Sequence, residues 1–158
     1  MSPPRDAGPI YADLVDAVTV LQHTGGVNGA KIGAVGFSNG GYFALWLAAT
    51  TKVQARVSYY GALSGAGTDK SLARFAQVFT ASSSPVLILH GTADDTLPVA
   101  AAQRLASILD ATGSPYQIQI YEAAGHRFER DLASAADQSA ATDAWQRTLS
   151  FLGEYLKP

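Results

Sequence analysis

Four short apolar runs, each separated from the next by a helix-length segment, constrain the fold of this 158-residue chain more than any other feature. Such runs are typical of strands buried in a sheet, and the repeated strand–helix order predicts parallel pairing with right-handed crossovers. We therefore expect an α/β fold with a mostly parallel sheet of about four strands flanked by helices, in one domain over residues 1–158. The predicted strands are 31–37, 55–60, 85–91 and 116–121.

The segments between the strands carry apolar residues at helical spacing. The predicted helices are 11–22, 40–50, 69–80, 98–111 and about 131–156. The last of these places Ala141, Trp145, Leu149, Leu152 and Leu156 along one stripe. Residues 116–121 alternate with period two, which predicts an edge strand with one wetter face.

Composition excludes several classes of function. The 11 Lys and Arg residues are scattered and the formal net charge is −2, so nucleic acid is not an expected partner. No window approaches the roughly 18 apolar residues of a membrane span, and the N-terminus lacks the apolar run of a signal peptide. We therefore expect a soluble, cytoplasmic protein without a membrane partner. Because the chain has no Cys, thiolate chemistry is excluded and any nucleophile must be an oxygen or an amine.

The segment Gly36–Gly40 is a G-x-S-x-G at a predicted strand-to-helix turn. A sharp bend there would expose the Ser38 hydroxyl, as in a nucleophile elbow. The motif alone is weak evidence, and its position after a strand makes it informative. The alternative interpretation is a tight turn that packs a helix on a sheet.

A serine nucleophile needs a base, and the sequence offers three histidines. His23 lies at the end of the first helix, where we expect it to face solvent. His90 ends the third strand, where a structural hydrogen bond to backbone is the expected role. His126 lies in a loop after the last strand, at the edge where open α/β sheets place their active sites, and is the best candidate base.

A carboxylate would orient that base, and Asp94 and Asp95 both follow the third strand. The order Ser, Asp, His along the chain belongs to α/β-hydrolases. From the residues alone either aspartate could serve, with the other capping the next helix. No Walker glycine loop or HExxH motif is present, so we expect neither a cofactor nor a metal.

These motifs together resemble the dienelactone hydrolase family of α/β-hydrolases over nearly the whole chain. The resemblance rests on residues 31–41 around the elbow, 57–61 after it, 94–98 and 121–128. The pattern Asp, two variable residues, a branched apolar residue and Pro is met by residues 94–98, and so the resemblance implies that Asp94 is the acid.

The resemblance also implies substrate contacts. Dienelactone hydrolases proper use a cysteine nucleophile, whereas Ser38 is similar to esterase-like branches, which implies hydrolysis of esters rather than of dienelactones. Arg130 matches an arginine that holds a substrate carboxylate in the family, with an ordinary exposed arginine as the alternative. We also assign Tyr42 and Tyr60 to substrate binding.

The family begins with further strands and a loop that supplies one of two oxyanion-hole amides, and none of these precedes Tyr11. We therefore expect a truncated α/β-hydrolase in which the Asn39 N–H is one oxyanion donor. A second donor would come from residues 2–9, from the side chain of Asn39 or Tyr42, or from a neighbouring subunit.

The first strand lacks a partner on one side, which predicts a homo-oligomer formed through that sheet edge. The aromatic residues expected to contribute to this surface are Tyr42, Phe43, Trp46, Tyr59 and Tyr60.

The function predicted from the sequence is a serine hydrolase of small carboxylic esters, with Ser38, His126 and Asp94 as the triad. Two alternatives stay open. One is a non-catalytic remnant or binding module, and the other is a thioesterase or acyltransferase that uses the same three residues.

Overall fold

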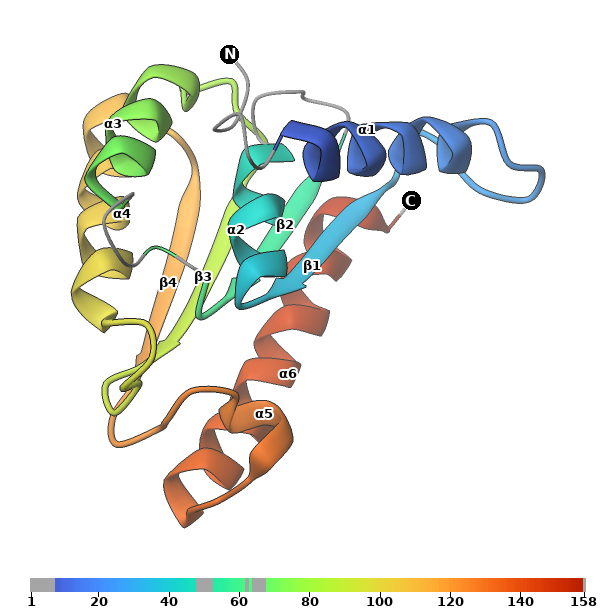
Figure 1. Cartoon of the computed structure of the whole chain (residues 1–158). Helices are drawn as coiled ribbons and strands as arrows, with labels where there is room; N and C mark the ends of the chain where they lie inside the picture. Colours follow the sequence, from blue (N-terminus) through green and yellow to red (C-terminus); the bar gives the residue numbers. More distant parts are fainter. Residues whose placement is uncertain (1–7, 48–52, 62, 64–67, 158) are drawn as a thin grey trace.

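The computed structural model describes residues 8–47, 53–61, 63 and 68–157 (Figure 1). The elements are α1 (Gly8–Gln22), β1 (Gly33–Phe37), α2 (Asn39–Trp46), β2 (Ala55–Tyr59), α3 (Thr68–Val78), β3 (Val86–Gly91), α4 (Val99–Thr112), β4 (Tyr116–Tyr121), α5 (Phe128–Asp131) and α6 (Ala135–Leu156). The alternation predicted from the apolar runs is therefore confirmed. Among the described residues, no helix combines the length and the apolar character needed to cross a membrane.

The four strands form one parallel sheet in the order β1-β2-β3-β4. Val35 pairs with Val57, and Val57 pairs in turn with Leu87, so the central strands are in register across the sheet. Strands β2 and β3 are buried along their whole length, whereas β1 and β4 lie at the edges and are partly exposed. Because all strands run the same way, their carboxyl ends meet along one edge, at the bottom of Figure 1.

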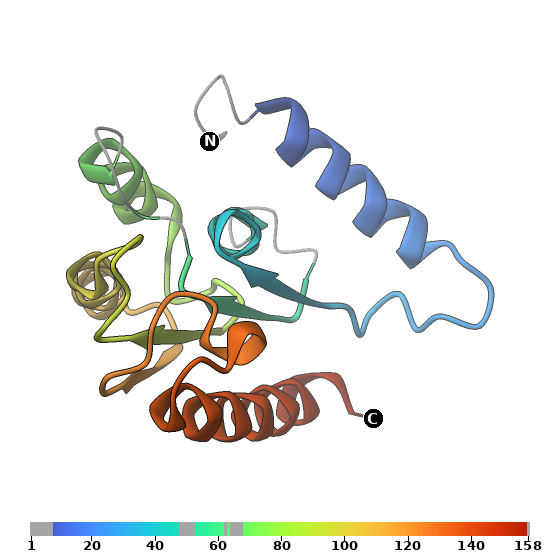
Figure 2. The ribbon, with the colours of Figure 1, turned by 60° about the horizontal axis from the view of Figure 1, so that its bottom comes forward.

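Helices cover both faces of the sheet (Figure 2). Helices α2, α3 and α4 lie on one face, and α6 lies across the other. Helix α1 lies on the α2 side, outward of β1, where Val18 joins a small apolar cluster with Ile32, Leu47 and Val53. This three-layer arrangement is the one that a parallel sheet requires.

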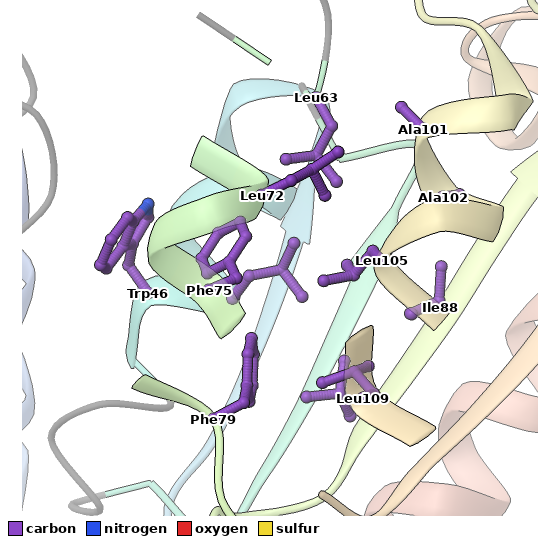
Figure 3. Close-up of a cluster of buried hydrophobic side chains, with 12 residues drawn as sticks. Trp46, Leu63, Leu72, Phe75, Phe79, Ile88, Ala101, Ala102, Leu105 and Leu109 are labelled. Atoms are coloured by element: carbon purple, nitrogen blue, oxygen red, sulfur yellow. The ribbon is translucent and has the colours of Figure 1, made fainter. Parts of the chain in front are cut away.

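One of the two main cores fills the space between the sheet and helices α2, α3 and α4 (Figure 3). Trp46 and Phe75 are fully buried there, with ring centroids 4.8 Å apart. On the opposite face, Tyr59 and Phe128 pack in one cluster with Phe151 of α6. Burial of Trp46, Tyr59 and Tyr60 corrects the expectation that these aromatic residues form part of an outer surface.

Helix α6 turns a different face to the sheet than its apolar stripe suggests. Trp145 and Leu149 are 52% and 49% exposed, whereas Asp137 and Thr148 are buried. The polar pair is buried because each has partners: Thr148 Oγ1 is 2.7 Å from the Tyr59 hydroxyl oxygen, and Asp137 forms a capping box with the Ser134 N-cap.

That capping box begins α6 at Ala135 rather than near residue 131, and α5 is a separate short turn. Helix α2 ends at Trp46, and residues 48–50 of the predicted helix lie outside the described residues. The remaining element ends agree with the prediction to within three residues.

Arg56, the second residue of the fully buried strand β2, is a guanidinium without solvent contact. It donates to the carbonyls of Ser84 at 2.6 Å and Leu47 at 3.1 Å, and more weakly to Val53 at 3.4 Å. Burial lowers the pKa of Arg56 to about 10, which leaves it charged at neutral pH. This side chain ties the connection before β2 to the one before β3.

We predict that Arg56→Ala lowers the free energy of unfolding by about 3 kcal/mol, measured by urea denaturation. The substitution removes the hydrogen-bond donors to three carbonyls and leaves a cavity. Together these two costs outweigh the gain from no longer burying a charge. Lys70→Ala on the exposed surface of α3 is the control and should change the free energy by less than about 0.5 kcal/mol. Equal effects of the two substitutions would contradict this role.

Candidate active site

Ser38 occupies a strained turn between β1 and α2. Its φ of 52° and ψ of −117° lie outside the regions that non-glycine residues favour. The backbone is held there by the Ser38 N–H, which donates to Tyr59 O at 3.0 Å, and by the Tyr42 N–H, which donates to Ser38 O at 3.1 Å. Its side chain makes no capping hydrogen bond to α2. This is the local geometry expected of a nucleophile elbow.

Two glycines allow this turn to form. A Cβ on Gly36 would overlap the carbonyl of Gly40, and one on Gly41 would lie 2.9 Å from Gly61 Cα. Gly40 differs, because a Cβ there would meet nothing within 4 Å. The close approach of β1 to α2 therefore depends on Gly36, while Gly40 faces open space.

Asp94 is held in the turn after β3 and faces His126. Its Oδ1 accepts hydrogen bonds from the backbone N–H groups of Thr96 at 3.0 Å and Leu97 at 2.7 Å. Its Oδ2 lies 2.8 Å from His126 Nδ1. Asp95 is exposed and accepts a hydrogen bond from the Thr96 hydroxyl. Of the two predicted aspartates, Asp94 therefore contacts the histidine.

His126 lies in the loop after β4, and its side chain is mostly buried. Donation of its Nδ1–H to Asp94 leaves Nε2 as the proton acceptor of the neutral ring. The loop is held by Asp137, whose Oδ1 accepts the Gly125 N–H at 2.8 Å. That hydrogen bond is the main reason that the pKa of Asp137 lies below its ordinary value, so its carboxylate persists at neutral pH.

A cavity of about 350 Å³ opens beside Ser38. Its lining residues are Phe37, Ser38, Tyr60, Arg127, Glu129 and Arg130. Ser38, Tyr60 and Arg130 were predicted from the sequence, whereas Phe37, Arg127 and Glu129 were not. The sequence feature that could have identified them is their position in the chain. Phe37 ends β1, and Arg127 and Glu129 closely follow His126.

Tyr60 links this cavity to the histidine. Its ring centroid is 4.6 Å from that of His126, and its hydroxyl donates to Glu129 Oε1 at 2.5 Å. Burial, and secondarily the hydrogen bond to Glu129, raise the pKa of Tyr60 far above its ordinary value, so the phenol stays protonated. With φ at 34°, Tyr60 is also in a backbone conformation that costs energy outside glycine.

The structure does not bring every predicted residue to the cavity. Tyr42 is half-buried with its hydroxyl 3.3 Å from Ser71 Oγ, and it does not line the cavity. Asn39 is exposed as the first residue of α2, where backbone N–H groups lack helical acceptors. Arg130 lines the cavity, but its Nε donates to Asp131 at 2.9 Å. Of the predicted donor segment 2–9, residues 2–7 lie outside the described residues.

The other two histidines differ in their surroundings. His23 is exposed as expected, with Nδ1 2.7 Å from Thr19 O. His90 is buried, with Nε2 2.7 Å from Leu97 O, as expected for a structural histidine. The same Nε2 also lies 3.3 Å from Asp94 Oδ2, a contact that the sequence did not reveal. Burial lowers the pKa of His90, so this ring is neutral at pH 7.

Comparison with known proteins identifies relatives over most of the chain. The dienelactone hydrolase family model matches residues 2–156. Carboxymethylenebutenolidase of Rhodococcus opacus is 35% identical over 127 residues, which cover 78% of this chain and 50% of that protein. The enzyme of the same name from Pseudomonas putida is 34% identical over 140 residues, 89% of this chain and 55% of that one. The chain thus spans about half the length of the curated relatives it matches.

Solved structures show the same fold. A candidate dienelactone hydrolase from Klebsiella pneumoniae superposes with a TM-score of 0.77 at 27% identity, over 95% of this chain and 62% of that one. The esterase Est2 of Thermogutta terrifontis has a TM-score of 0.73 at 24% identity, over 94% and 65% of the two chains. The four-stranded sheet and its helices therefore correspond to part of an α/β-hydrolase fold.

The two glycines of the motif should differ in their tolerance of alanine. We expect Gly36→Ala to lower the free energy of unfolding by about 3 kcal/mol, because the added methyl overlaps backbone that cannot move independently. Gly40→Ala is the matched control and should be neutral or stabilising by up to about 1 kcal/mol, since alanine favours the helix more than glycine. Urea denaturation measures both, and a destabilised Gly40→Ala would contradict the open space at that position.

Proposed function

Because the chain belongs to the dienelactone hydrolase family, we propose that it is a serine hydrolase of small carboxylic esters. The observation that carries the proposal is the hydrogen bond between His126 and Asp94, at the same sheet edge as the strained Ser38 and its cavity. A buried carboxylate on one imidazole nitrogen leaves the other nitrogen to act as a base. The names of the two carboxymethylenebutenolidases support the same class of reaction.

In the proposed reaction Ser38 Oγ attacks the ester carbonyl while His126 Nε2 takes its proton. The histidine then protonates the departing alkoxide as the tetrahedral intermediate collapses to an acyl-serine. Asp94 keeps the imidazole oriented and stabilises its protonated form. In the second half of the reaction His126 activates water, which releases the acid and regenerates Ser38.

The oxyanion of that intermediate would be stabilised by the Asn39 N–H, at the N-terminus of α2 where the helix dipole also favours negative charge. Loss of one oxyanion donor costs roughly 10²–10³ in kcat in serine hydrolases. We expect a second donor to complete the hole, and the candidates remain residues 2–9, a side chain near the elbow, or a neighbouring subunit.

Phe37 and Tyr60 form the aromatic wall of the cavity, and Arg130 contributes to its outer side. We propose that Tyr60 and Arg130 contact the substrate there, with Tyr60 also holding the His126 ring in place. We assign the Tyr42 hydroxyl no contact with the substrate, because it lies next to Ser71 Oγ and not in the cavity.

The first test is hydrolysis of p-nitrophenyl butyrate by the wild-type protein and by Ser38→Ala. We expect the substitution to lower kcat/KM by at least about 10³-fold, because the acyl-enzyme can no longer form. The matched control is Ser82→Ala, an exposed serine in the loop before β3, which should retain wild-type activity.

Equal, background-level rates for the wild type and Ser38→Ala would reject esterase activity on this substrate and favour the binding module. Rates that rise when an alcohol or a thiol replaces water as acceptor would instead favour an acyltransferase.

We further propose that two copies of the chain associate through β1. This strand is an edge of the sheet, its residues Gly33–Phe37 include no charge and no proline, and Val35 and Phe37 are 40% and 41% exposed. Edge strands normally carry such charges or prolines to prevent pairing. Antiparallel pairing of β1 with its symmetry mate would satisfy the free backbone groups and cover both apolar side chains.

Light scattering tests this association. The wild-type protein at micromolar concentration should have the mass of a dimer, and Val35→Lys should shift it to the monomer, because a charge in the paired edge opposes burial. Leu132→Lys replaces another exposed apolar residue, far from β1 in the chain, and should leave the dimer intact. A monomeric wild-type protein would refute the proposal.

A further inference from the structure

Three charged side chains line the cavity beside Ser38: Arg127, Glu129 and Arg130. The two arginines form ion pairs with Asp131, which does not line the cavity. Arg130 Nε is 2.9 Å from Asp131 Oδ1, and Arg127 Nε is 3.4 Å from Asp131 Oδ2. The two arginine side chains are 64% and 50% exposed, so water and salt screen their charges. The hydrogen bond from Arg130 lowers the pKa of Asp131, which keeps the shared carboxylate ionised.

The third charged residue, Glu129, has the opposite environment. Its Oε1 accepts the Tyr60 hydroxyl, and its Oε2 is buried without a hydrogen-bond partner among the described residues. None of the ion pairs in the described part of the chain includes Glu129. Because the Tyr60 phenol keeps its proton, the pair is fixed with Glu129 as the acceptor.

The burial of each charged group determines how strongly it interacts with a charged substrate. A partly buried charge acts through a lower effective dielectric than an exposed one, and salt screens it less. The arginine charges are exposed and partly neutralised by Asp131, whereas the Glu129 carboxylate has no cation bonded to it. An anionic group that enters the cavity would therefore interact with the Glu129 carboxylate through a lower effective dielectric than with the two arginines.

We propose that Glu129 determines substrate specificity by excluding carboxylate-bearing esters, so that the cavity accepts esters with an uncharged acyl group. This inference rests on the proposed function of Ser38. It also assigns Arg130 a contact with a neutral substrate, in place of the carboxylate contact that the family resemblance implies.

A pair of substrates with six-carbon acyl groups tests the proposal: p-nitrophenyl hexanoate and the p-nitrophenyl monoester of adipic acid. They share the leaving group and differ by a terminal carboxylate. We expect kcat/KM of the wild-type protein to favour the hexanoate by about tenfold or more, and Glu129→Gln to reduce that ratio by about fivefold. The amide oxygen of the glutamine can still accept the Tyr60 hydroxyl, which favours retention of the fold.

Glu154→Gln is the matched control, because it removes the same charge from an exposed position on α6 near the opposite edge of the sheet. It should leave the substrate ratio unchanged. A wild-type preference for the adipate monoester, or a ratio that Glu129→Gln does not alter, would overturn the proposal.

A binding experiment separates this inference from the esterase proposal. Methyl hexanoate and monomethyl adipate are titrated into Ser38→Ala and into Ser38→Ala with Glu129→Gln, with binding followed by NMR. Weaker binding of the adipate ester in the first protein, and recovery in the second, would support the role of Glu129 even if the wild type hydrolyses neither ester. Tighter binding of the adipate ester to Ser38→Ala would show that the arginines prevail and would refute it.

Discussion

The hydrogen bond between Asp94 and His126 is the interaction on which the rest of the site depends, because it joins two loops that the sheet only brings near each other. The loops approach so closely that a Cβ on Gly91 would overlap the Ala124 carbonyl. The Ala93 N–H donates to that same carbonyl at 3.0 Å. Backbone contacts thus fix the separation of the loops, and the side-chain hydrogen bond then selects one rotamer and one tautomer of the histidine.

Two residues with strained backbone conformations directly follow the first two strands, at the same edge of the sheet. Ser38 and Tyr60 both have positive φ, and each backbone N–H donates to the neighbouring strand, to Tyr59 O and Leu89 O respectively. These hydrogen bonds continue the parallel ladder beyond the strand ends and offset the conformational cost. The serine and the aromatic ring thus directly follow the ends of β1 and β2, whereas Asp94 and His126 lie in the loops after β3 and β4.

The sequence predicted the strands well because β2 and β3 are buried on both faces and read as continuous apolar runs. It also located Ser38, Asp94 and His126 at strand ends, since parallel topology brings these ends together. It failed on the face of α6, where hydrogen bonds allow Asp137 and Thr148 to be buried while Trp145 stays exposed. The hydrogen bond between Tyr60 and Glu129 joins residues 69 positions apart. No sequence pattern predicts that these two side chains are in contact.

Within the described part of the chain, Asp94 orients His126 and Asp137 holds its loop. The chain spans about half the length of its curated relatives. On the other side of the elbow, Gly40 faces a separate cavity lined by Ile10, Leu14 and Phe43. In the proposed mechanism, orientation of the base and stabilisation of the oxyanion would therefore depend on different elements. The first would depend on α6 and on the loops after β3 and β4, and the second on the N-terminus of α2.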